Sequence, residues 1–122
     1  MTLDYLDFDY SEDTEGVGVF DAMASTGAAQ APAVQAEVVQ VLAWAHEHFG
    51  APAGPVGDGG TWDFDLQGMQ ESTLPQVFGF DAETLRLHVE PGAPGAVRHT
   101  LSLSVSGTPA FCDAFREAFE LG

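Results

Sequence analysis

Lysine, asparagine and isoleucine do not occur in this sequence of 122 residues, and only three arginines stand against 19 aspartates and glutamates. The formal net charge of −16 argues against nucleic acid and anionic membranes as partners, because phosphate groups are bound by cations. The three absent residue types have A/T-rich codons, which is typical of a GC-rich bacterial genome. Arginine codons are GC-compatible, so codon usage does not explain the charge.

Cysteine is equally scarce. The single Cys112 cannot form an intrachain disulfide, which fits a reducing compartment.

The opening residues contain neither a basic segment nor a long apolar run, so we expect no signal peptide and no membrane anchor, and a cytoplasmic location. The length and the 45% hydrophobic content predict a single domain over residues 1–122, with a core that needs no disulfide or metal.

The few cations are also unevenly placed. Arg86 is the first arginine, and 15 of the 19 carboxylates precede it. The first two-thirds of the chain therefore has no strong cation of its own to pair with its acids.

Two segments have the apolar spacing of amphipathic helices. The first covers residues 32–49, with Pro32 in its first turn and Gly50 just past its end. The second begins at Pro109, with Thr108 as its N-cap. The expected buried stripes are Val34, Val38, Val41, Leu42, Ala45 and Phe49 in the first helix, and Phe111, Phe115, Ala118 and Phe119 in the second.

Six further segments alternate or carry strand-forming residues: 3–10, 17–24, 61–69, 77–80, 85–89 and 97–106. With the helices they give the order β-β-α-β-β-β-β-α. Short turns between most strands favour antiparallel pairing, and the outward Asp, Ser and Thr positions indicate one wet face. The predicted fold is an α+β two-layer sandwich, with a mostly antiparallel sheet and two helices packed on one face.

A pairing register for the last two strands follows from their faces, because directly opposite residues share a face. Placing Leu87 opposite Leu101 buries both leucines. The same register pairs Leu85 with Leu103 and Glu90 with Arg98.

The clearest candidate site is a repeated acidic pattern. Leu-Asp-Phe-Asp at 6–9 recurs as Trp-Asp-Phe-Asp at 62–65, and both pairs of aspartates point outward from expected strands. The candidate residues are Asp7, Asp9, Asp63 and Asp65. If the two strands are neighbours, the crowded carboxylates need compensation, since like charges destabilise a sheet. Solvated strand faces, an acidic face that binds a protein, and a Ca²⁺- or Mg²⁺-dependent carboxylate site remain the alternatives.

Trp44 is a second candidate, because it lies off the apolar stripe of its helix. Aromatic residues in such places are common anchors of interfaces. The alternative is that the Pro- and Gly-rich loop at 51–60, or the segment 25–31, folds over the indole ring.

Other chemistry has little support. No pair among the four histidines has the spacing of a zinc site, and Cys112 is expected to be a small core residue. The glycines at 54–60 lack a following helix start and a lysine, so they do not indicate a phosphate site. We therefore assign no catalytic residue, no metal and no cofactor.

The most economical hypothesis is a small, acidic, non-catalytic binding module that engages a basic protein surface, in the manner of an inhibitor, an immunity protein or an acidic mimic of nucleic acid. One alternative is a metal-assisted enzyme that uses the paired aspartates of two strands. Another is a homo-oligomeric domain, such as a homodimer, that is joined through exposed strand edges or Trp44.

Overall fold

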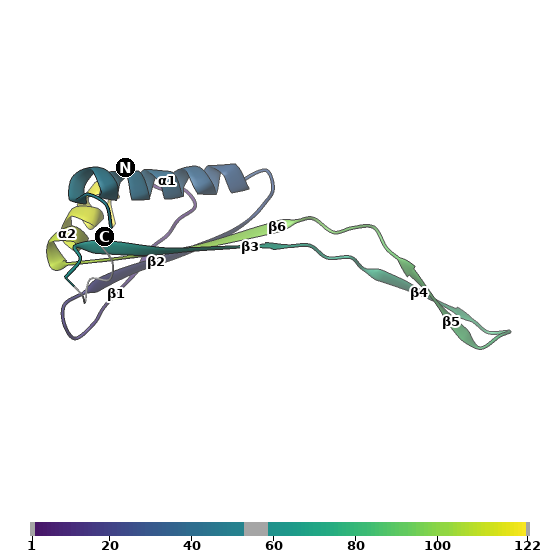
Figure 1. The fold of residues 1–122 in the computed structure, drawn as a ribbon. Coiled ribbons are helices and arrows are strands. Elements are labelled where there is room, and N and C mark those ends of the chain that lie inside the picture. Colours follow the sequence, from purple (N-terminus) through teal and green to yellow (C-terminus); the bar gives the residue numbers. More distant parts are fainter. Residues whose placement is uncertain (1, 53–58, 122) are drawn as a thin grey trace.

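A four-stranded antiparallel sheet with two helices on one of its faces forms the body of the molecule (Figure 1). The computed structural model describes residues 2–52 and 59–121. In chain order, the elements of this described part are β1 Asp9–Glu12, β2 Gly18–Gly27, α1 Ala31–Phe49, β3 Trp62–Glu71, β4 Gln76–Asp81, β5 Arg86–Pro91, β6 Arg98–Gly107 and α2 Pro109–Ala118. The α+β class and the expected order of elements are confirmed.

The strands of the body are not arranged in chain order. The sheet runs β1-β2-β6-β3, and every neighbouring pair is antiparallel. In the central strand β6, Leu103 lies opposite Ala22 on one side and Leu66 on the other. Strands β2, β3 and β6 have ten residues each and make up most of the sheet.

Strands β4 and β5 form a separate two-stranded ribbon, which extends from the far ends of β3 and β6 as an arm (Figure 1). Two backbone hydrogen bonds continue the pairing between sheet and ribbon. The N–H of Gly92 donates to the carbonyl of Pro75 at 2.7 Å, and the N–H of Gly95 donates to that of Thr73 at 2.8 Å. From β3 to β6 the chain is therefore one long hairpin whose outer half leaves the body. We call residues 72–97 the arm.

The predicted pairing of Leu87 with Leu101 is wrong. Leu87 lies opposite Phe80 within the arm, whereas Leu101 lies between Ala24 and Gly68 in the body. The error has a physical origin, because strands with the same alternation of apolar and polar residues satisfy the rule of shared faces equally well. β5 pairs with the strand before it, and β6 pairs with two strands far from it in sequence.

Several large apolar side chains of the strands are exposed, although alternation favours one buried face for each strand. Leu85, Leu87 and Val89 belong to the arm and are 53–75% exposed. Phe64 and Leu66 lie opposite buried residues of β6, on the side of the sheet that the helices cover. They are nevertheless 37% and 43% exposed, since β3 is an edge strand.

Helix α1 has the predicted boundaries to within one residue. Pro32 occupies its first turn, and Gly50 ends it with φ = 79°, a left-handed conformation that glycine adopts readily. The N–H of Gly50 donates to the carbonyl of His46 at 3.0 Å. The predicted stripe is buried over Val34, Val38, Val41 and Ala45. Most of the predicted loop at 51–60 lies outside the described residues.

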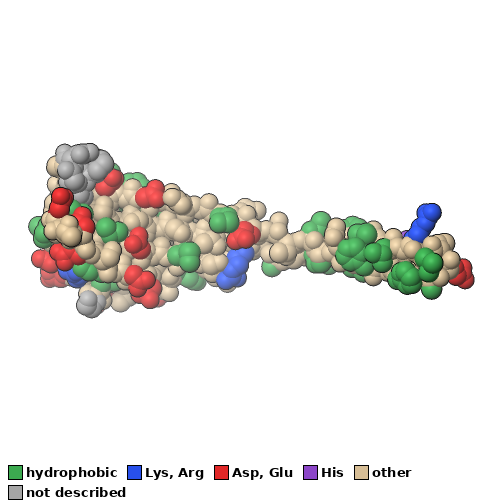
Figure 2. Space-filling model, turned by 90° about the horizontal axis from the view of Figure 1, so that it is seen from below, with side chains coloured by type: hydrophobic (Ala, Val, Ile, Leu, Met, Phe, Trp, Pro, Cys, Tyr) green, Lys and Arg blue, Asp and Glu red, His purple; other side chains and the backbone are tan. Residues whose placement is uncertain are grey.

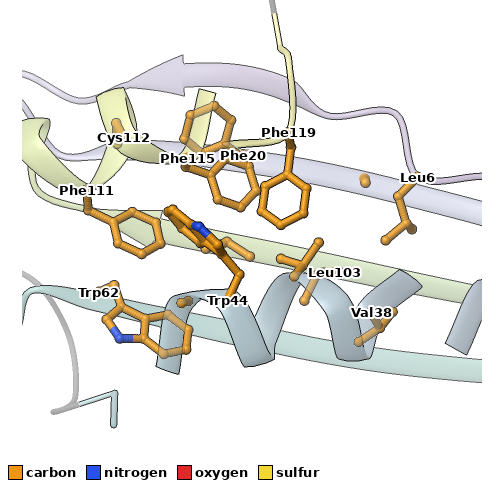
Figure 3. Close-up of a cluster of buried hydrophobic side chains, with 14 of the residues drawn as sticks. Leu6, Phe20, Val38, Trp44, Trp62, Leu103, Phe111, Cys112, Phe115 and Phe119 are labelled. Carbon is orange, nitrogen blue, oxygen red and sulfur yellow. The ribbon is translucent and has the colours of Figure 1, made fainter. Parts of the chain in front are cut away.

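Most of the large buried aromatic side chains gather where α2 meets the sheet and the C-terminal half of α1 (Figure 3). The Thr108 hydroxyl accepts a hydrogen bond from the N–H of Phe111, as expected for an N-cap. Phe111 and Phe115 are fully buried. The Trp62 ring stacks on Phe111 at 5.7 Å with an interplanar angle of 3°, and its Nε1–H donates to the Gly50 carbonyl at 2.9 Å.

Hydrogen bonds to a buried carboxylate hold the N-terminal segment, and the alternation of its residues did not predict them. The expected strand at 3–10 pairs only from Asp9 onward, as β1. Before it, the backbone N–H groups of Asp4, Tyr5 and Leu6 donate to the carboxylate of Glu37 at 2.9–3.2 Å. Glu37 is only 8% exposed and is the buried charged residue of the described core. The hydrogen bonds join the N-terminal segment to α1 and compensate for the burial of the carboxylate.

Candidate functional site

One face of the four-stranded sheet is left uncovered by the helices, and carboxylates line it. Asp9 of β1 lies directly opposite Asp21 of β2, Asp21 lies opposite Ser104 of β6, and Ser104 lies opposite Asp65 of β3. These four residues form a row that crosses all the strands of the sheet. Asp63 belongs to the next row, opposite Ser106. We call this surface the open face.

Figure 2 views the molecule from the side of the open face and shows acidic side chains spread over the body. A hollow of about 540 Å³ lies among them. Its polar and charged lining consists of Asp7, Asp9, Asp21, Asp65, Gln67, Ser102 and Ser104. Its walls also include Met23, whose side chain is 68% exposed, and Met69 on the same face is 58% exposed.

The carboxylates of β3 make only local hydrogen bonds. Asp63 accepts from the N–H of Phe64 at 2.8 Å, and Asp65 accepts from the side-chain amide of Gln67 at 3.0 Å. Within residues 2–52 and 59–121, the carboxylates of the open face form no ion pair. The negative charge of Asp9, Asp21, Asp63 and Asp65 is therefore presented to solvent without a neighbouring cation to neutralise it.

The arginine of this face lies at its far end, beside the arm. Arg98 donates to the hydroxyl of Ser25 at 2.7 Å and to its carbonyl at 3.1 Å. The Ser25 hydroxyl is also hydrogen-bonded to that of Thr100 at 3.0 Å. The open face therefore carries Arg98, with Glu71 directly opposite it, near the arm, and its aspartates lie toward the other end.

The four aspartates chosen from the sequence share the open face, although β1 and β3 are opposite edges of the sheet. Three strand spacings separate Asp9 from Asp65, or about 14 Å. Sequence reasoning missed Asp21, which lies between these edges. The alternation of Phe20, Ala22 and Ala24 on the core side was the signal that would have placed Asp21 outward.

Trp44 is not on the surface. It is only 9% exposed, and its ring centroid lies 5.5–5.9 Å from those of Phe111, Phe115 and Phe119 (Figure 3). The aromatic side chains at the C-terminal end of the chain cover the indole, a packing that neither sequence interpretation included. A buried ring cannot contact a partner, so Trp44 is removed from the candidate binding residues.

Cys112 is buried against the sheet and lies outside the open face. Its Sγ–H points to the carbonyl of Gly107 at 3.5 Å, and burial raises the pKa of the thiol above its usual value of 9.0. A raised pKa keeps the sulfur protonated at neutral pH and unreactive as a nucleophile. Across residues 2–52 and 59–121, no three or more His, Cys, Asp or Glu side chains cluster so that they could hold a metal ion.

The arm is the second unusual surface, and sequence reasoning missed it. Large apolar side chains along the arm are all more than half exposed; they are Leu74, Val77, Phe78, Phe80, Leu85, Leu87 and Val89. Exposed apolar side chains in such a continuous run are typical of interaction surfaces. The signal in the sequence was the cluster of Pro91, Gly92, Pro94 and Gly95 at and after the end of β5, which interrupts regular strand structure between the ribbon and β6.

Comparison of the chain with protein-family models, with curated proteins and with solved structures found no match in any of the three. Neither helix of the described residues combines the length and the apolar character needed to cross a membrane.

Proposed function

We propose that the chain is a non-catalytic protein-binding module, which binds a basic surface of another protein through its open face. Inhibitors and immunity-like proteins act in this way, by covering a basic site on a partner. The feature that carries the proposal is the row of Asp9, Asp21 and Asp65 on the sheet face opposite α1 and α2.

The composition of the open face supports this function. Carboxylates attract a basic partner over long distance and increase the rate of association, an effect that salt weakens. The exposed Met23 and Met69 supply flexible apolar surface beside the charges. A face with both features offers steering by charge and contact by apolar groups.

The arrangement also argues against the metal-assisted enzyme. A calcium ion takes its oxygen ligands at about 2.3–2.6 Å, so carboxylates that share one ion lie within a few ångströms of each other. Asp9 and Asp65 are three strands apart, and the side chain of an aspartate does not cover half of that distance. The two acidic motifs are therefore better suited to a broad charged surface than to one metal site.

Two triple variants test the proposal. The first, Asp9→Asn with Asp21→Asn and Asp65→Asn, removes three charges from the open face. The control, Glu15→Gln with Glu47→Gln and Glu117→Gln, removes three exposed charges elsewhere. Wild type and both variants are immobilised, incubated with a lysate of the producing cells at low and at high salt, and the retained proteins are identified.

We expect a basic protein that wild type and the control variant retain at low salt, that high salt releases, and that the open-face variant does not retain. Equal retention by both variants would show that net charge alone accounts for binding, and retention of no protein would also contradict the proposal. Titration of the purified partner then gives the stoichiometry.

A further inference from the structure

The outer edge of β3 is a long strand edge that the body of the molecule leaves uncovered. β3 pairs with β6 on one side only, and its pairing is regular over all ten residues, whereas the other edge strand, β1, has four residues. Edge strands are usually protected from further pairing by short length, proline, lysine or a bulge. β3 contains neither proline nor lysine, and its charged side chains lie on the open face only. Its backbone is therefore accessible to another strand.

Two hydrogen bonds show which backbone groups of β3 point outward. The Thr61 carbonyl accepts from the N–H of Thr108, just after β6, at 3.0 Å, so the odd-numbered residues bond toward β6. The N–H of Phe64 donates instead to the carboxylate of Asp63 in its own strand, at 2.8 Å. Because bonding directions alternate along a strand, the even-numbered residues of β3 present their N–H and C=O groups to the outside.

The same even-numbered residues turn their side chains to the α1 side of the sheet, and they leave an uneven apolar surface at the edge. Phe64 is 37% exposed and Leu66 is 43% exposed. At Gly68 a Cβ atom would meet its nearest neighbour only at 3.9 Å. Beside this glycine, α1 and the sheet leave a hollow of about 330 Å³, whose lining includes Val34 and Leu101. The edge thus carries an aromatic ring at one position and open space four residues further on.

We propose that two copies of the chain form a homodimer by pairing their β3 edges, antiparallel about a two-fold axis that passes between the two Leu66 residues. Outward groups bond only to outward groups, so the axis must pass through a residue of β3 and not between two. Each Leu66 then lies opposite its equivalent, as a two-fold interface requires. The two four-stranded sheets become one continuous sheet, with the helices of both copies on the same side.

The charges of β3 select this register. With the axis at Leu66, Asp65 lies opposite Gln67 of the second copy, and Asp63 lies opposite Met69, so no carboxylate faces another. An axis at residue 65 would set Asp65 opposite its equivalent, and an axis at residue 67 would set Asp63 opposite Glu71. Like charges in directly opposite positions destabilise a sheet. The alignment centred on Leu66 avoids this cost, and its neighbours do not.

The shape of the edge fits the same register. Phe64 of each copy lies opposite Gly68 of the other, and an aromatic side chain opposite a glycine covers the exposed glycine backbone and stabilises the pairing. Leu101 lies opposite Gly68 on its other side, in β6. The Phe64 ring therefore extends the apolar row from Leu101 across the glycine, at the side of the hollow that Gly68 leaves open. The two-fold axis makes this contact twice.

Salt affects this dimer and the open-face interaction in opposite directions. The two Asp65 side chains lie diagonally across the interface, about 7–8 Å apart, and each copy has a net charge of −16. Screening by salt therefore strengthens the dimer, whereas it weakens the binding of a basic partner. The failure of one proposal can thus be distinguished from the failure of the other.

The first test is the mass of the protein in solution over a range of concentrations, at low and at high salt, measured by sedimentation and by light scattering after gel filtration. Gln67→Asp places a carboxylate opposite Asp65 of the second copy. The control, Met23→Asp, adds the same charge to the same face, but on β2, which is not an edge strand. Both side chains are exposed, so both variants are expected to fold.

The mass of wild type is expected to approach twice the 12.9 kDa of one chain as the concentration rises, and to do so at lower concentration in high salt. Gln67→Asp should raise the dissociation constant of the dimer about tenfold, because the unfavourable pair occurs twice, and Met23→Asp should change it much less. A wild type that stays monomeric in every condition overturns the proposal, and so does equal weakening by both variants. A dimer that Phe80→Ser weakens and Gln67→Asp does not would be joined through the arm, which also overturns it.

Cross-linking tests the position of the axis. Opposite residues of a hydrogen-bonded antiparallel pair have Cα atoms about 5.5 Å apart, which a disulfide can span, so Leu66→Cys is expected to link the two copies on mild oxidation. Met69→Cys is the control, since its equivalents lie about 20 Å apart in this register. The native Cys112 is buried. Equal rates of cross-linking for the two variants, or faster linking through Met69→Cys, would overturn the alignment centred on Leu66.

Discussion

Gly18 and Gly107 lie directly opposite each other on β2 and β6, at the end of the sheet where α2 packs. A Cβ atom on Gly18 would lie 2.5 Å from the Cys112 sulfur and 2.7 Å from Cε1 of Tyr10. A Cβ atom on Gly107 would overlap the ring of Phe111. The two glycines therefore set how closely α2 approaches the sheet.

Gly107→Ala is expected to destabilise the protein by about 1–3 kcal/mol, because the added methyl group must displace the buried Phe111 ring. Urea unfolding followed by tryptophan fluorescence measures the change. Gly79→Ala is the matched control, since a Cβ there meets no atom within 4 Å. Equal effects of both substitutions would show that backbone conformation, rather than the approach of α2, explains the need for glycine.

The helices could be predicted from the sequence because the signals that define them are local. Pro32 and Gly50 mark α1, and Thr108 with Pro109 marks the start of α2. Pairing of the strands is not local, since alternation fixes which residues share a face but does not fix which strand lies beside it. The arm could not be predicted for this reason.

The candidate site could also be predicted only in part, because its layout depends on the strand order. Alternation was sufficient to put Asp7, Asp9, Asp63 and Asp65 on one face of the sheet. The strand order determines their separation, and it also places Asp21 among them. A covered Trp44 was one of the two alternatives, but the covering residues could not be predicted because these aromatic residues lie at the other end of the sequence.

Glu37→Gln is expected to cost about 1–3 kcal/mol of stability. The carboxylate accepts N–H groups from Asp4, Tyr5 and Leu6, whereas an amide offers one oxygen and turns its own N–H groups toward donors. Hydrogen exchange of these three backbone amides should accelerate more than exchange in β6. Glu47→Gln on the exposed side of α1 is the control and should change stability by less than about 0.5 kcal/mol.

Cys112 makes the stability of the protein depend on pH in the alkaline range. Burial raises the pKa of its thiol above 9.0, so the unfolded chain loses this proton at lower pH than the folded one. The contribution of the protonated thiol to the free energy of unfolding is fully present below pH 9.0 and is lost as the pH rises through the pKa of the folded state. This free energy falls by at most about 1.4 kcal/mol per pH unit.

Urea unfolding of wild type and Cys112→Ala at a series of pH values isolates this contribution, since the other titrating groups are common to both. The stability of wild type relative to the variant should be constant up to about pH 9 and should fall above it. A difference that stays constant at alkaline pH would mean that the thiol is accessible to water in the folded protein.

Asp21→Asn is expected to stabilise the protein, because Asp21 faces Asp9 directly across β1 and β2. Like charges in opposite positions destabilise a sheet, and relief of such a pair is worth about 0.2–1 kcal/mol at low salt. High salt screens the repulsion and should reduce the gain. Once Asp21 is neutral, Asp9→Asn should add little, so a double-mutant cycle gives the coupling between the two.

Asp65→Asn is the control for that cycle, since Asp65 lies on the same face but opposite Ser104 instead of a carboxylate. An equal gain from Asp65→Asn would mean that total charge, and not the pair, determines the effect. Asp21→Asn could both stabilise the sheet and weaken capture of the basic partner. In that case the Asp9–Asp21 pair lowers stability in the free protein and favours binding. The reason is that a cationic surface would remove the repulsion between the two carboxylates, which water and salt only screen.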